Sequence, residues 1–124
     1  LMVAGLPNMF MITGPQSPGV KSQMILSIEW HINWVANCLS YMRDNNYTRV
    51  AAEVKAQQQW VDHVREVADS TLYPLANSWY MGANIPGKAR VFMPYVAGVE
   101  AYTKECNRVT QNGYQGFEFS TNIS

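Results

Sequence analysis

Apolar residues recur at spacings of three and four between Ser22 and Asn46, and this pattern limits the possible folds more than any other feature. The stripe consists of Ile25, Ile28, Ile32, Val35, Leu39 and Met42. The spacing places them on one face of an α-helix, with Ser22 as a suitable N-cap and Asn45 and Asn46 at the end. Trp30 and Trp34 lie four residues apart on a flank of this stripe. The sequence therefore predicts a long helix that is covered on more than one side.

Two further segments, 55–73 and 98–112, also have a helical period. The apolar positions are Trp60, Val61, Val64, Val67, Ala68 and Leu72 in the first segment, and Val99, Tyr102, Cys106 and Val109 in the second. The second segment ends at Asn112-Gly113, which is a signal for a left-handed C-cap. Short apolar or alternating runs near 9–12, 90–96 and 117–119 predict strands, with an edge position for the run that contains Pro94. The alternation at 50–54 predicts either a short strand or an extended lead-in to the next helix. The residues therefore predict a soluble α+β unit, mostly helical with a few short strands.

The composition excludes several classes of protein. The 124 residues suffice for one domain or part of one, and nine acidic and nine basic residues are scattered singly. This argues against a nucleic-acid groove or a polybasic membrane patch, and no apolar run reaches the ~18 residues of a bilayer span. Cys38 and Cys106 form no CxxC pair, which favours two buried thiols in a reducing compartment, and we expect the cytoplasm. The apolar start without an initiator methionine suggests a piece of a longer chain.

Two loops, at 13–24 and 77–90, are candidates for ligand contact. The second loop has few residues that could continue a helix or strand, because it contains Gly82, Asn84, Pro86 and Gly87. Trp79 and Tyr80 lie at its start, and Lys88 lies near its end. The two aromatic rings could fill a gap beneath the loop, or the indole and the ammonium could contact a flat, anionic ligand. Composition alone leaves both interpretations open.

Catalytic motifs are absent from the sequence. It contains no GxGxxG turn, no Walker loop, no GxSxG motif and no cluster of metal ligands. His31 and His63 have no second ligand at metal spacing, so we interpret both as satisfied or exposed imidazoles. The chain is therefore either a binding or scaffolding piece, or part of a protein whose chemistry belongs to a cofactor and to residues outside it.

Motifs in both loops resemble the C-terminal part of Baeyer–Villiger monooxygenases, which depend on FAD and NADPH. The matching stretches are Phe10-Met11-Ile12-Thr13-Gly14-Pro15, Ser17-Pro18, Ser27-Ile28-Glu29, Trp79-Tyr80, Gly82-Ala83-Asn84-Ile85-Pro86-Gly87-Lys88 and Arg90-Val91-Phe92. The similarity runs from about Gly5 to Phe119 in one register. It implies an α/β fold class, in which 1–124 is a single C-terminal segment of a flavoprotein with two dinucleotide-binding domains. Residues 1–46 would form the flavin-side strand, loop and helix, and 47–124 a helix, the NADP lid loop and a strand–helix–strand unit.

The resemblance also implies a function. The parent enzyme would use NADPH and O2 to convert ketones to esters or lactones, together with upstream FAD- and NADP-binding domains. The catalytic residues would lie outside this chain, so the isolated segment would be inactive. Two alternatives are a flavin enzyme that oxygenates sulfur or nitrogen, and a stand-alone interaction domain without catalysis.

Site residues follow from the resemblance in the same way. Met24 would contact the FAD isoalloxazine, and Trp79 would close over NADP from a mobile loop that also carries Asn84 and Lys88. The substrate pocket would be lined by Pro18, Gly19, Val20, Lys21 and Ser22. The sequence departs from the best-known members at Gln16, Gly19, Lys21, Gln23 and Trp30. Because Lys21 is charged, it puts the substrate preference in doubt.

Overall fold

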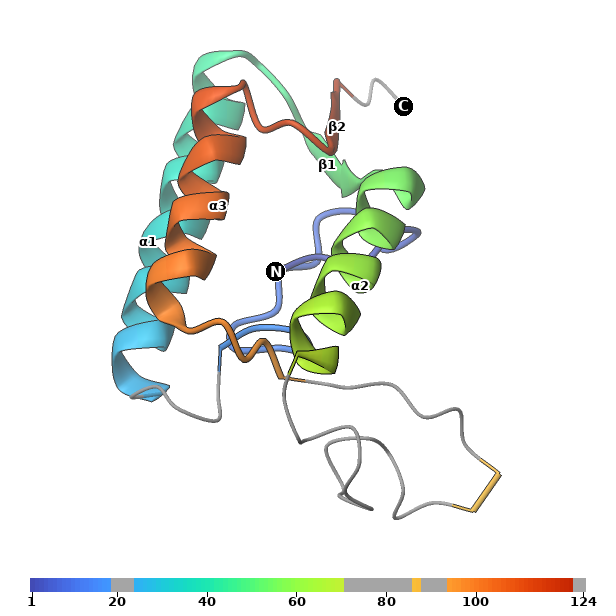
Figure 1. The fold of residues 1–124 in the computed structure, drawn as a ribbon. Coiled ribbons are helices and arrows are strands. Elements are labelled where there is room, and N and C mark those ends of the chain that lie inside the picture. Colours follow the sequence, from blue (N-terminus) through green and yellow to red (C-terminus); the bar gives the residue numbers. More distant parts are fainter. Residues whose placement is uncertain (19–23, 71–85, 88–93, 122–124) are drawn as a thin grey trace.

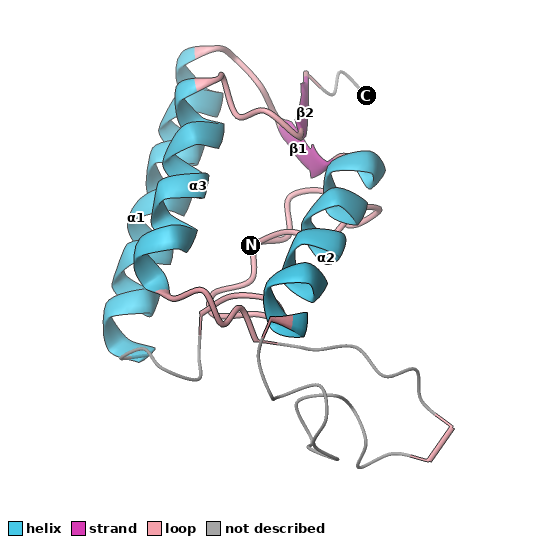
Figure 2. Cartoon of the chain, viewed as in Figure 1, coloured by secondary structure: helices cyan, strands magenta, loops and turns pink. Residues whose placement is uncertain are grey.

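The structure is a computed structural model that describes residues 1–18, 24–70, 86–87 and 94–121 (Figure 1). The elements in these ranges are α1 (Met24–Asp44), β1 (Arg49–Ala52), α2 (Val54–Asp69), α3 (Val99–Gln111) and β2 (Phe117–Ser120). Helices α1 and α3 lie side by side, and α2 stands apart from them across the N-terminal segment (Figure 2). Within these ranges, none of the helices combines the length and the apolar content that crossing a bilayer requires. The described part is thus mostly helical, as the sequence predicts.

The two strands form a short antiparallel ribbon. Arg49 pairs with Ser120 at one end and Ala52 pairs with Phe117 at the other. The amide of Glu53 continues the ribbon by donating to the Gly116 carbonyl, at 2.9 Å. This ribbon confirms the strands predicted near 50–54 and 117–119. Because β1 lies between α1 and α2 in the chain, this pairing also fixes where α2 begins.

Helix α1 confirms the predicted helix over its described length, but it buries a different face. Its buried residues are Ser27, His31, Trp34, Cys38 and Met42. Three members of the predicted stripe are exposed, namely Ile25 (73%), Ile32 (52%) and Leu39 (51%). The Trp34 ring instead packs edge-on against Tyr114 at 5.4 Å. Both sets of residues have helical spacing, so the period alone could not show which set faces the neighbouring elements.

Helices α2 and α3 agree with the predicted faces. Val64 and Ala68 are buried on α2, and Tyr102 is buried on α3. The left-handed end predicted for α3 is present, since Gly113 has φ 70° and its amide donates to the Thr110 carbonyl. The core has two clusters, one around Trp34, Cys38 and Tyr114 and one around Val64, Tyr95 and Tyr102.

Two predicted strands are not formed in the described residues. Residues 9–12 are irregular, because this segment meets β1 only at Asn8, which exchanges hydrogen bonds with Val50. A strand needs a continuous ladder of such bonds, and Thr13 turns the chain away with φ 50°. In the run at 90–96, Pro94 and Val96 lie outside any strand and Tyr95 forms one isolated bridge. Residues 90–93 are not among the described ones.

Candidate functional site

The first candidate loop begins with a segment, Thr13–Pro18, that is held at both ends. The Thr13 amide donates to Nδ1 of His31 at 3.0 Å. At the other end, the Tyr95 amide donates to the Ser17 carbonyl at 3.0 Å, and Pro18 forms an isolated parallel bridge with Tyr95. Ser17 and Pro18 are buried. The described start of the loop is therefore held in place by contacts to α1 and to the segment before α3.

His31 lies in the interior of the molecule, with 1% of its surface exposed. Its Nε2 is 2.9 Å from the Tyr102 hydroxyl, while Nδ1 accepts from Thr13. A ring nitrogen that accepts carries no proton, so the proton of the neutral ring lies on Nε2 and is donated to the Tyr102 oxygen. Burial lowers the pKa of His31 to about 4. The histidine is neutral at pH 7, and its interpretation as a satisfied imidazole is confirmed.

Tyr102 joins the elements that surround this histidine. Its ring lies 5.4 Å from His31, 5.8 Å from Trp30, 5.9 Å from Trp60 and 6.0 Å from Tyr95, measured between centroids. Burial raises the pKa of the Tyr102 hydroxyl well above its usual range, so the hydroxyl keeps its proton. One tyrosine on α3 therefore contacts α1, α2 and the segment that holds Pro18.

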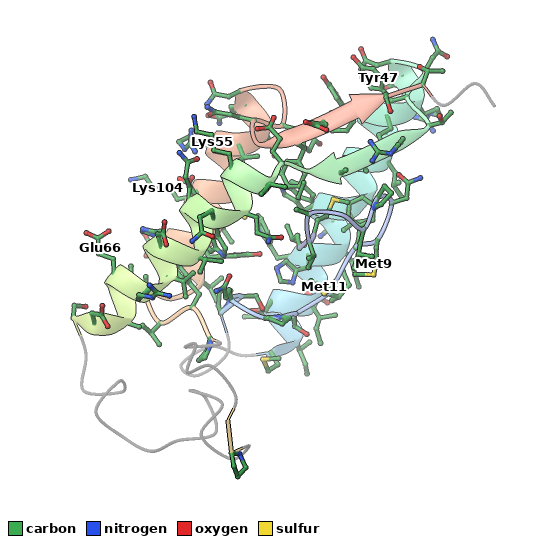
Figure 3. The ribbon with its side chains drawn as sticks, turned by 90° about the vertical axis from the view of Figure 1, so that its right-hand side faces the viewer. Met9, Met11, Tyr47, Lys55, Glu66 and Lys104 are labelled. Atoms are coloured by element: carbon green, nitrogen blue, oxygen red, sulfur yellow. The ribbon has the colours of Figure 1, made fainter. Side chains whose placement is uncertain are left out.

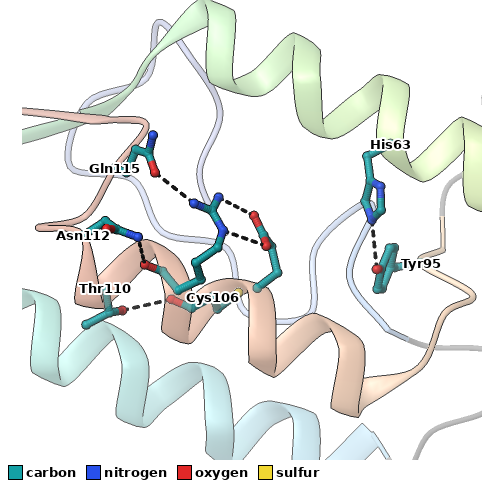
Figure 4. Close-up of polar contacts among 8 residues, drawn as sticks. His63, Tyr95, Cys106, Thr110, Asn112 and Gln115 are labelled. Atoms are coloured by element: carbon teal, nitrogen blue, oxygen red, sulfur yellow. Dashed lines mark hydrogen bonds and ion pairs between the residues drawn. The ribbon is translucent and has the colours of Figure 1, made fainter.

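Helix α2 contributes a second polar contact (Figure 4). Nε2 of His63 is 3.0 Å from the Tyr95 hydroxyl, and the Trp60 ring packs against the Tyr95 ring at 5.0 Å. His63 is itself exposed, as expected from its place on the polar face. Because Tyr95 also bonds to Ser17, the start of the first candidate loop meets α2 and α3 at this residue.

A cavity of about 840 Å³ opens between α2 and α3. Its lining includes the rings of Trp34 and Trp60 and the charged side chains of Glu53, Lys55 and Glu105. Trp34 Nε1 is buried and has no hydrogen-bond partner among the described residues. Glu66, farther along α2, points outwards from the helix (Figure 3). The lining also includes the imidazole of His63 and the thiol of Cys106.

An exposed ion pair holds the turn before β2 against α3. Arg108 contacts the Glu105 carboxylate at 2.6 and 3.0 Å and donates to Gln115 at 2.9 Å (Figure 4). These bonds, opposed by partial burial, lower the pKa of Glu105. Because the pair is exposed, its role is to fix the turn rather than to supply a buried charge.

The thiols do not add a reactive group. Both cysteines are free, which confirms the expectation of two thiols without a disulfide. Burial raises the pKa of Cys38 and of Cys106 to about 11, so both are protonated at neutral pH. In the part of the chain that the structure describes, no three side chains of metal-binding type come together.

The predicted site residues fall into two groups. Met24 begins α1 and is 45% exposed, next to the exposed Ile25 and Leu26. Pro18 is fully buried and borders Trp30 and Tyr102. The remaining residues lie outside the described ranges: Gly19, Val20, Lys21, Ser22, Trp79, Asn84 and Lys88. Tyr95 and Tyr102, which connect the start of the first candidate loop to the helices, were not singled out as site residues, because helical spacing marks Tyr102 only as a core position.

Comparison with known proteins identifies what this arrangement resembles. No family model matches the chain. A Baeyer–Villiger monooxygenase from Pseudooceanicola batsensis is 40% identical over 114 residues, which are 92% of this chain and 21% of the relative. A cyclopentanone 1,2-monooxygenase from Comamonas sp. is 36% identical over 95% of this chain and 22% of its own length. A phenazine N-monooxygenase from Lysobacter antibioticus is 31% identical over 92% of this chain and 21% of its own length.

Solved structures agree with these relatives. An oxidized steroid monooxygenase bound to NADP has a TM-score of 0.89 and 35% identity, covering 98% of this chain and 22% of that chain. A complex of OTEMO with FAD and NADP has a TM-score of 0.86 and 29% identity, covering 97% of this chain and 23% of that chain. The chain thus spans about a fifth of the length of the curated relatives it matches. Over that fifth, it is homologous to the Baeyer–Villiger monooxygenases.

Proposed function

We propose that this chain is part of a flavoprotein that uses NADPH and O2 to convert ketones to esters or lactones. The observation that carries the proposal is the homology over nearly the whole chain, at 40% identity to a Baeyer–Villiger monooxygenase and a TM-score of 0.89 to a steroid monooxygenase. In such an enzyme the cofactor supplies the difficult chemistry, and this segment would help to bind and shield it.

The described residues fit a flavin at the start of α1. Met24, Ile25 and Leu26 expose apolar and thioether surface there, which suits the flat face of an isoalloxazine. FAD, when bound, would supply the oxygen-transfer chemistry. Met24 would pack against its ring, and Pro18 to Ser22 would line the substrate pocket. The buried Pro18 would fix the first residue of that lining.

The second candidate loop would serve NADP. Trp79, with weaker contributions from Asn84 and Lys88, would cover the dinucleotide and exclude water from the flavin site during oxygen transfer. Residues 1–46 would form the flavin side and 47–124 the side that carries the lid. The partners would be the FAD- and NADP-binding domains, the ketone and O2. We place the enzyme in the cytoplasm, where Cys38 and Cys106 would remain reduced.

The test is made on the flavoprotein that contains this segment. The purified protein is supplied with NADPH, O2 and a panel of cyclic and aryl ketones, and the products are identified by mass spectrometry. Ketone-dependent NADPH oxidation with an ester or lactone that gains one oxygen atom supports the proposal. Absence of such a product across the panel, with FAD bound, contradicts it.

Oxygenation of a heteroatom is the second candidate. It is favoured by the 31% identity to a phenazine N-monooxygenase. The same assay with a thioether and an aromatic N-heterocycle separates the two activities. A sulfoxide or N-oxide formed without any ester would assign the chain to this class of reaction.

A further inference from the structure

Helix α1 has two apolar faces, and the described residues cover only one of them. The covered face consists of Ser27, His31, Trp34, Cys38 and Met42. Ile25, Ile32 and Leu39 are all more than half exposed, and successive members lie two helical turns apart. They therefore form one stripe, which lies about a third of the way around the helix from the covered face.

This aliphatic stripe is apolar along its whole length. The partly buried Ile28 and Val35 lie on the same side of the helix, and no charged residue interrupts the stripe between Ile25 and Leu39. Over that distance the stripe is about 21 Å long. The remaining side of α1 is exposed and polar, with Glu29, Asn33, Asn37 and Ser40. A polar side is suited to water, whereas an exposed aliphatic stripe of this length is typical of an interface.

The other two helices do not have such a stripe. After Val54, every exposed residue of α2 is polar or charged, and so is every exposed residue of α3. The outward faces of α2 and α3 thus follow the usual pattern of a helix that packs on one side and meets water on the other. Helix α1 departs from this pattern, so it needs a second cover that the described residues do not supply.

We propose that the FAD-binding domain of the parent flavoprotein covers the aliphatic stripe of α1. This chain matches only about a fifth of the length of its relatives, so most of the parent polypeptide lies outside the structure. The stripe also begins next to Met24, which is exposed at the start of α1 and would contact the flavin. The identity of the cover therefore rests on the proposed function, whereas the need for a cover rests on this chain alone.

The first measurement is thiol labelling with a maleimide in the flavoprotein that contains this segment. Ile32→Cys places a thiol on the aliphatic stripe, and the matched control Asn33→Cys places one on the polar side. Both positions are exposed in this segment, so a difference in rate reports what the rest of the parent covers. The thiol at position 32 should react at least several-fold more slowly than the thiol at position 33. Equal rates overturn the proposal.

The native thiols of this segment give little background in that experiment. Burial raises the pKa of Cys38 and of Cys106 to about 11, so both react slowly at neutral pH. Tandem mass spectrometry assigns each label to its cysteine.

The second measurement identifies the cover. Leu39 is replaced by the photoreactive p-benzoylphenylalanine, the flavoprotein is irradiated, and the cross-linked peptides are sequenced by mass spectrometry. A cross-link to the FAD-binding domain of the same polypeptide is the expected result. A cross-link to the NADP-binding domain, or a product of twice the mass that joins two copies, overturns the proposal.

The third measurement tests the consequence for the cofactor. Ile32→Glu would place a carboxylate in an apolar interface without a partner, so the rate of FAD release should rise several-fold. Asn33→Glu is the matched control and should leave that rate unchanged. Equal rates of release in the two variants contradict the proposal. Labelling and cross-linking need no ketone, so if wild type forms no ester, the proposed function fails while these two measurements still decide what covers α1.

Discussion

As the pH falls, the protonation of His31 should destabilise the fold before most carboxylates are protonated. The folded chain holds His31 neutral with a pKa of about 4, because the ring is buried. In the unfolded chain the same group titrates near 6.5. The stabilising contribution is therefore complete above about pH 6.5 and is lost as the pH falls towards 4.

The size of the effect follows from the two pKa values. Linkage gives a loss of about 2 kcal/mol in the free energy of unfolding at pH 5, and about 3 kcal/mol at pH 4, relative to neutral pH. The loss has a local cause. A protonated ring has two donors, so Nδ1 can no longer accept the amide of Thr13, while the Tyr102 oxygen can still accept from Nε2.

The assay is urea unfolding of wild type and His31→Gln at fixed ionic strength, at several pH values between 7.5 and 4. The glutamine cannot titrate but can retain both hydrogen bonds. The acid effect from Glu105 is common to both proteins and cancels in the difference. We expect wild type to lose about 2 kcal/mol more than the variant between pH 7.5 and pH 5. Parallel stability curves would refute the assignment of a buried, neutral His31.

Three other substitutions test packing and the lid. Gly116→Ala should destabilise the chain by about 2–3 kcal/mol in urea unfolding, since φ is 90° and an added Cβ would meet the Ala56 Cβ at 2.9 Å. Gly5→Ala, with φ 84° and nothing within 4 Å, is the matched control and should cost about 1 kcal/mol. Val64→Ala should cost about 1–3 kcal/mol by the same method, because Val64 is 1% exposed. In the flavoprotein, Trp79→Ala should weaken NADPH binding and lower the amount of ester formed per NADPH. An unchanged amount of ester per NADPH would contradict the lid role proposed for Trp79.

The sequence predicted the elements whose signals are local. The period of α1, the alternation near 50–54 and the Asn112-Gly113 end of α3 are all decided within a few residues, and the structure contains each of them. The prediction of a strand at Met9–Ile12 was wrong, because strand formation there is not decided by local residues alone. Whether an apolar run becomes a strand depends on a partner edge, and only Asn8 reaches β1.

The candidate site was predictable only in part. Loop positions followed from resemblance, and the flavin contact of Met24, which is exposed at the start of α1, stays a prediction. The network of His31, Tyr95 and Tyr102 was not predictable, because its members lie up to 71 residues apart in sequence. No local pattern distinguishes a tyrosine that packs in a core from one whose hydroxyl also orients a histidine. That distinction depends on which side chains the fold brings to the same place.

The wrong face predicted for α1 has a physical explanation that also bears on function. A prediction of the buried face from aliphatic side chains selects Ile25, Ile32 and Leu39. The fold instead buries Ser27, His31 and Trp34. The buried set includes His31 because this face meets the segment that begins at Thr13, and His31 accepts the Thr13 amide. An aliphatic face would pack well but could not hold an amide. Helix α1 therefore directs His31 towards the candidate site and leaves aliphatic side chains exposed in this chain.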